Sequence, residues 1–166
     1  MVSVEILSQY PTLASLPAPR LRAAARASRE EVYDAGEPIP MQTDWLYILQ
    51  EGDVILHVEL HSGRHCGGIA MISMDSPGQI FGWRSVVQDE RLDVRAVCQG
   101  PTRLIAVDLD RLKASETGFL LRKQAVACLY SLLQDTGLCP RNPADRVVLG
   151  AEVCNWADED LTFAKR

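Results

Sequence analysis

The sequence predicts a mainly β protein with flanking helices: a double-stranded β-helix (jelly-roll) barrel with α-helices at its N- and C-terminal ends. Two observations carry this prediction. In the middle of the chain, apolar and polar residues alternate with a period of two, which is typical of half-buried strands. Glycines interrupt the same region at short intervals, and many short strands joined by glycine turns indicate a sandwich or a barrel.

The composition is that of one folded domain with a tail. The chain has 166 residues, of which 47% are hydrophobic and 23% charged. The net charge of -5 argues against nonspecific nucleic-acid binding, which needs a positive face, although a local basic patch is compatible with it. No membrane span and no signal peptide are evident. The five cysteines are odd in number and include no CxxC pair, so we expect free thiols in the cytoplasm.

Residues 1–32 are expected to form N-terminal helices. Pro17 and Pro19 fit a helix boundary. Small and apolar residues then recur at helical spacing, at Leu21, Ala24, Ala25 and Ser28. Four arginines fall around the opposite side, at Arg20, Arg22, Arg26 and Arg29. We interpret these arginines as a solvated helix face.

Residues 33–108 are expected to form the β-roll. Apolar residues occupy the even positions of 54–60, and Ser62-Gly63 suits a two-residue hairpin turn. A second alternation places Leu92, Val94, Ala96 and Cys98 on one face, with Arg91, Asp93 and Arg95 on the other. Residues 103–107 form another apolar strand, which ends at Asp108.

Residues 109–135 are expected to form the C-terminal helices. Asp108 or Asp110 can cap a short helix, and residues 119–133 carry the broad apolar stripe of a longer one. That stripe either covers the barrel or forms a homodimer seam. Residues 136–166 show no clear period and are assigned to a tail, so the folded domain is expected to span residues 1–135.

Five short segments in order resemble the motifs of one family. They are AGEPI at 35–39, LYILQEG at 46–52, the interval from Gly52 to Gly63, PGQIFG at 77–82, and the closing strands at 96–108. Together they resemble the cyclic-nucleotide-binding domain of the catabolite-activator-like sensor family. The resemblance implies a β-roll of about eight strands flanked by helices. It also implies a regulatory role, with cAMP or cGMP as the usual ligand.

The resemblance implies a phosphate-binding cassette after Gly82. In the family, backbone N–H groups and an arginine from the next strand hold the cyclic phosphate, and a glutamate after the glycine binds the ribose. This chain departs from that pattern, because Trp83 replaces the glutamate and Leu92 falls at the arginine position. Arg91 is one residue out of phase, so it reaches the pocket only through a bulge.

The cassette 81–95 nevertheless offers candidate ligand-binding residues. They are Phe81, Gly82, Trp83, Arg84, Ser85, Arg91 and Arg95. The sequence Phe81-Gly82-Trp83 is similar to that of a bacterial subset of the family in which Trp follows the glycine. Arg84 offers a cation to an anionic ligand, and Trp83 either stacks on a base or fills the vacated space. The expected ligand is cAMP, cGMP or another small anion, and no metal is expected.

Two alternatives to a ligand-binding sensor remain open at this point. A degenerate domain without ligand could serve interaction or dimerisation, with Trp83 and Leu92 filling the pocket. A cupin-like metalloprotein is the weaker alternative, because histidines four apart on a strand lie roughly 13 Å apart; the residues concerned are His57, His61, His65 and Cys66.

No catalytic motif is present, so we expect no enzyme. The acidic residues after Gln134, interrupted by Pro140 and Pro143, do not suit a DNA-binding module.

Overall fold

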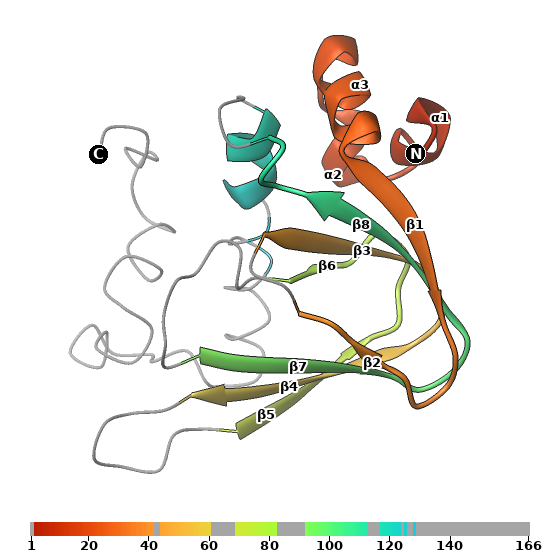
Figure 1. The fold of residues 1–166 in the computed structure, drawn as a ribbon, viewed down its shortest axis with the longest axis vertical. Helices are drawn as coiled ribbons and strands as arrows, with labels where there is room; N and C mark the ends of the chain where they lie inside the picture. Colours follow the sequence, from red (N-terminus) through yellow and green to blue (C-terminus); the bar gives the residue numbers. More distant parts are fainter. Residues whose placement is uncertain are drawn as a thin grey trace, which may run out of the picture.

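The computed structural model describes residues 2–41, 44–60, 69–82, 92–112 and 117–123, together with Ala125 and Cys128. Within these residues three helices precede eight strands (Figure 1). They are α1 (Val4–Leu7), α2 (Pro11–Ala14), α3 (Ala18–Arg26), β1 (Ser28–Tyr33), β2 (Pro38–Ile39), β3 (Trp45–Glu51), β4 (Val54–Leu60), β5 (Ile69–Met74), β6 (Ile80–Phe81), β7 (Leu92–Cys98) and β8 (Thr102–Asp108). Residues 117–123 are helical as well.

The strands form two antiparallel four-stranded sheets. The first sheet has the order β1-β8-β3-β6, and the second has the order β2-β7-β4-β5. Figure 1 shows them as two layers, with the helices beside the first sheet. The predicted mainly β architecture with flanking helices is therefore confirmed. The ladders among the described residues form two sheets and are not closed into one barrel.

The second sheet shows the predicted alternation. Its buried side chains lie in three rows across the strands, and we call the face that they form the inner face. The rows are Cys98, Val54 and Met74; Ala96, Leu56 and Ile72; and Val94, Val58 and Ala70. The odd-numbered residues between them are half-buried or exposed. One apolar face thus sets the register of all three strands.

The register of β4 with β5 corrects the expected turn at Ser62-Gly63. A two-residue turn there would put Glu59 opposite Cys66, whereas Glu59 pairs with Ile69. The physical reason is which residues of the two strands share a face, the even-numbered or the odd-numbered ones. The observed register pairs even residues with even residues and so buries the apolar side chains of both strands, while a turn at 62–63 would pair even with odd. Residues 61–68 themselves lie outside the described part.

The N-terminal helical zone ends earlier than residue 32. Helix α3 stops at Arg26, and β1 begins at Ser28 and pairs with β8 along its whole length. Ser28 keeps a link to the helix, because its Oγ donates to the carbonyl of Ala24 at 2.6 Å. Arg29 is a strand residue whose guanidinium lies 4.1 Å from the centre of the Trp45 ring, so it is not on a helix face. Ladder hydrogen bonds therefore outweigh the helical spacing of this segment.

The helix that begins at residue 117 packs through an apolar face. Leu121 and Ala125 are fully buried, and their spacing places them on one side of the helix. Most of the expected dimer seam, and the whole of the tail 136–166, lie outside the described residues. Among the described helices, none has the length and hydropathy that crossing a membrane requires.

Candidate functional site

Gly82 follows β6 at the start of the expected cassette. Gly82 has a φ of +98°, a conformation that glycine adopts without strain. A Cβ atom at this position would lie 2.7 Å from the carbonyl oxygen of Trp45 and 3.0 Å from Cδ2 of Tyr47. The close approach to β3 and the backbone conformation both require glycine. Gly82 is therefore held against β3 directly after β6.

An aromatic pair lies beside Gly82. Phe81 is fully buried, and its ring stacks on that of Tyr47 at a centroid distance of 5.4 Å. The two residues are opposite each other in the β3–β6 ladder. The Tyr47 hydroxyl donates to the carbonyl of Pro40, which follows β2 of the second sheet. The pair therefore connects β6, which leads into the expected cassette, with β3 of the first sheet and, through Pro40, with the segment after β2 of the second sheet.

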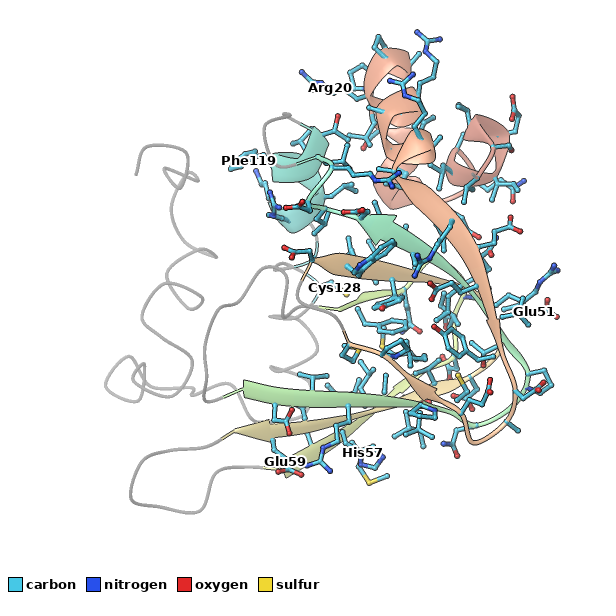
Figure 2. All side chains as sticks on the ribbon, in the orientation of Figure 1. Arg20, Glu51, His57, Glu59, Phe119 and Cys128 are labelled. Carbon is cyan, nitrogen blue, oxygen red and sulfur yellow. The ribbon has the colours of Figure 1, made fainter. Side chains whose placement is uncertain are left out.

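Arg95 lies on the outer face of the second sheet. Its side chain is 66% exposed, and Nη2 lies 3.4 Å from both Glu59 and Asp93. Figure 2 labels Glu59 and His57 on the same outer side. The cause is the strand alternation, because the neighbouring Val94 and Ala96 fill the inner face. We therefore remove Arg95 from the candidate ligand-binding residues.

Four of the predicted ligand-binding residues lie outside the described part of the chain. They are Trp83, Arg84, Ser85 and Arg91. The β4–β7 ladder runs from Leu92 to Cys98 without a shift of register. A bulge that turned Arg91 inward would therefore have to precede Leu92. The ligand-contacting roles of these four residues stay predictions.

A contact that the sequence analysis missed joins β6 to the C-terminal helix. The thiol of Cys128 donates to the carbonyl of Ile80, with Sγ 3.5 Å from the oxygen (Figure 2). Burial raises the pKa of Cys128, so the thiol keeps its proton and can donate it. From the sequence, Cys128 can be recognised only as a small residue on the apolar stripe of a helix. Ile80 and Cys128 are 48 residues apart, and no local pattern pairs them.

A polar cluster links three side chains along edge strand β1. Glu31 accepts from Nε of Arg29 through Oε1 and from the hydroxyl of Tyr33 through Oε2, both at 2.6 Å. Burial, followed by this hydrogen bond and the charge of Glu31, raises the pKa of Tyr33. Since the donors satisfy both carboxylate oxygens, the cluster is best explained as structural.

Three side chains with a raised pKa should make the stability of the fold decrease at alkaline pH. Burial is the first cause of the raised pKa of Cys98, Cys128 and Tyr33. Because the folded-state pKa of each group is raised, its contribution to stability is present below its unfolded pKa, about 8.5 for the two thiols and about 10 for Tyr33, and is lost as pH rises further. We expect the free energy of unfolding in urea to fall from about pH 8 to about pH 10. A constant or rising value would contradict this, and Cys98→Ala/Cys128→Ala should make the fall shallower.

The described residues contain no group of three or more His, Cys, Asp or Glu side chains arranged to hold a metal ion. Of the four residues considered for a metal, His57 lies on the outer face of the second sheet, opposite Arg95 and Met71 in the ladders. The other three, His61, His65 and Cys66, lie outside the described part.

The comparisons with known proteins give one consistent result at the level of structure. No family model and no curated protein matches the sequence. A candidate cyclic nucleotide-binding protein from Geobacter metallireducens is similar in structure, with a TM-score of 0.60, 27% identity, and coverage of 80% of this chain and 99% of that one.

Two regulatory proteins of protein kinase A are similar in structure as well. The regulatory domain from Toxoplasma gondii, solved with cAMP, has a TM-score of 0.57 and 21% identity over 75% of this chain. The regulatory subunit of a cAMP-independent kinase from Trypanosoma cruzi, solved with guanosine, has a TM-score of 0.58 and 20% identity over 81%. This chain spans 48% of the length of each. The chain has the fold of cyclic nucleotide-binding domains.

Proposed function

We propose that this chain is a regulatory sensor domain that binds a small anionic ligand, a cyclic nucleotide, at the cassette that begins at Phe81. The observation that carries the proposal is Gly82, which has a positive φ and lies against β3 directly after the stacked Phe81. The fold is that of the Geobacter protein, whose described class is cyclic nucleotide binding, and of regulatory domains solved with cAMP and with guanosine. Catalysis forms no part of the proposal.

The chemistry of the ligand follows from the sequence after Gly82. A cyclic phosphate carries one negative charge, and backbone N–H groups together with a guanidinium bind such a group well. We propose Arg84 as this guanidinium and Ser85 as an additional hydroxyl donor. Trp83 would stack on the base or fill the space beside it. cAMP and cGMP are the first ligands to test, and no metal is needed.

The contact between Cys128 and Ile80 suggests how binding would be transmitted. Ile80 lies two residues before Gly82, and its carbonyl accepts from the C-terminal helix. A ligand that favours one position of Gly82 and β6 would therefore also favour one packing of this helix. If residues 119–133 form a dimer seam, the same shift would reach a second copy of the chain.

Thermal unfolding with added cAMP, cGMP or a cyclic dinucleotide tests the proposal. A ligand at about 100 times its dissociation constant should stabilise the fold by about 2.7 kcal/mol. Arg84→Ala should weaken binding by roughly 10–100-fold, because it removes a charge-assisted hydrogen bond. Arg95→Ala is the matched control, because Arg95 lies on the outer face, and its affinity should stay within about twofold. An unchanged melting temperature at millimolar concentrations of all three would instead support a ligand-free interaction module.

A further inference from the structure

A second candidate binding site lies between the end of α3 and the turn after β8. A cavity of about 240 Å³ is lined there by Ala23, Arg26, Ala27, Arg111 and Leu112. None of these residues belongs to the cassette. Figure 1 shows α3 beside the segment that follows β8. The lining combines two guanidinium groups with an apolar floor, so it suits a ligand that has a carboxylate next to an apolar group.

Arg111 is oriented in advance for such a ligand. Its Nε lies 3.2 Å from Oδ2 of Asp108 in a salt bridge. The other oxygen of Asp108 accepts from the backbone N–H groups of Asp110 and Arg111, at 3.0 and 3.2 Å, and so caps the turn. The Arg111 side chain is 70% exposed. The salt bridge engages Nε, so the terminal amino groups can bind a carboxylate in a bidentate manner.

The charged residues that line this cavity are both arginines, Arg26 and Arg111, although the chain as a whole carries -5. Helix α3 has three arginines and no acidic residue, and Arg26 lies in its last turn. Figure 2 shows Arg20 extending from the same helix. Arg122, from the helix that begins at residue 117, donates to the carbonyl of Leu109 and ties that helix to the turn at 3.2 Å. The surface is therefore complementary to an acidic segment.

The sequence of this chain contains such a segment. Residues 158–163 read Asp-Glu-Asp-Leu-Thr-Phe, three carboxylates followed by Leu161 and Phe163. From Cys128 to residue 158 the chain can extend about 100 Å, so its length does not prevent docking. We propose that the cavity docks residues 158–163 of the same chain. The carboxylates would bind Arg26 and Arg111, and an apolar side chain would contact Ala23, Ala27 and Leu112.

Zero-length carbodiimide cross-linking of the full chain tests this site. The variant Arg26→Lys keeps the positive charge and introduces an amine that can be joined to a carboxylate. Peptide mass spectrometry should find residue 26 joined to residues 158–160. The yield should exceed that of Arg103→Lys by at least about tenfold, since docking raises the effective concentration to millimolar values. Arg103 is the matched control because it is exposed and lies at the other end of β8.

Two further measurements complete the test. Asp158→Asn/Glu159→Gln/Asp160→Asn should abolish the cross-link, and raising the salt from about 0.05 to 1 M should reduce its yield. A mixture of isotopically labelled and unlabelled chains separates docking within a chain from docking between copies. The proposal is overturned if residues 158–160 are not joined to residue 26, if Arg103→Lys reacts equally, or if the link forms only between labelled and unlabelled chains.

Discussion

Gly82→Ala is expected to destabilise the fold by about 2–4 kcal/mol and to remove ligand binding at the cassette. The backbone conformation alone, with φ at +98°, costs an L-residue about 1–2 kcal/mol. The new methyl group would also lie 2.7 Å from the carbonyl oxygen of Trp45, which is backbone and cannot rotate away. Relief requires β6 to move away from β3, so Gly82 would be displaced together with the strand. Urea unfolding and nucleotide titration measure the two effects.

Gly36→Ala separates the cost of the positive φ from the cost of the close approach to β3. Gly36 also has a positive φ, of +81°, but a Cβ atom there meets nothing within 4 Å. It should therefore cost only the backbone strain of about 1–2 kcal/mol and leave ligand binding unchanged. If both variants lose the same stability and bind ligand alike, the close approach of Gly82 to β3 has no functional importance.

Phe81→Ala is expected to cost about 3–5 kcal/mol, the other large effect. Phe81 is fully buried, and removing its ring leaves a cavity beside Tyr47 and deletes the stacked pair. Total stabilities are about 5–15 kcal/mol, so this variant could be substantially unfolded. Guanidinium or urea denaturation gives the value, and Met71→Ala is the control. Met71 is 63% exposed, and its replacement should change stability by less than about 0.5 kcal/mol.

Phe81→Leu keeps the test informative if the alanine variant does not fold. Leucine retains most of the buried volume, so we expect a loss of about 1–2 kcal/mol and a folded protein. A loss below about 1 kcal/mol for Phe81→Ala in a folded protein would show that the aromatic pair does not hold the two sheets together.

The parts of the fold that could be predicted are those in which one face is buried. The alternation of β4 and of β7 appears in the sequence because Val54, Leu56 and Val58 face inward, as do Val94 and Ala96. Strand β1 could not be predicted in this way. Its residues, SREEVY, show no apolar alternation. The ladder with β8 and the position of Arg29 over the Trp45 ring of β3 hold this edge strand.

The candidate site was predictable in part. Phe81 and Gly82 were recognised from a motif, and the glycine geometry now gives a physical reason for it. The alternation around Arg95 itself implies the outward position of this residue, because Val94 and Ala96 on either side are buried. The contact of Cys128 with Ile80 joins two distant parts of the chain and leaves no periodic signal. The arginine-lined cavity likewise requires α3 and the turn after β8 to be placed side by side.

Calorimetric titration of the unmodified chain with cAMP and cGMP tests the central claim most directly. The proposed sensor function predicts saturable heat with one site per chain, and a loss of that heat in Gly82→Ala when the variant is still folded. The absence of heat for both nucleotides at millimolar concentration, with a folded protein, would contradict cyclic-nucleotide binding.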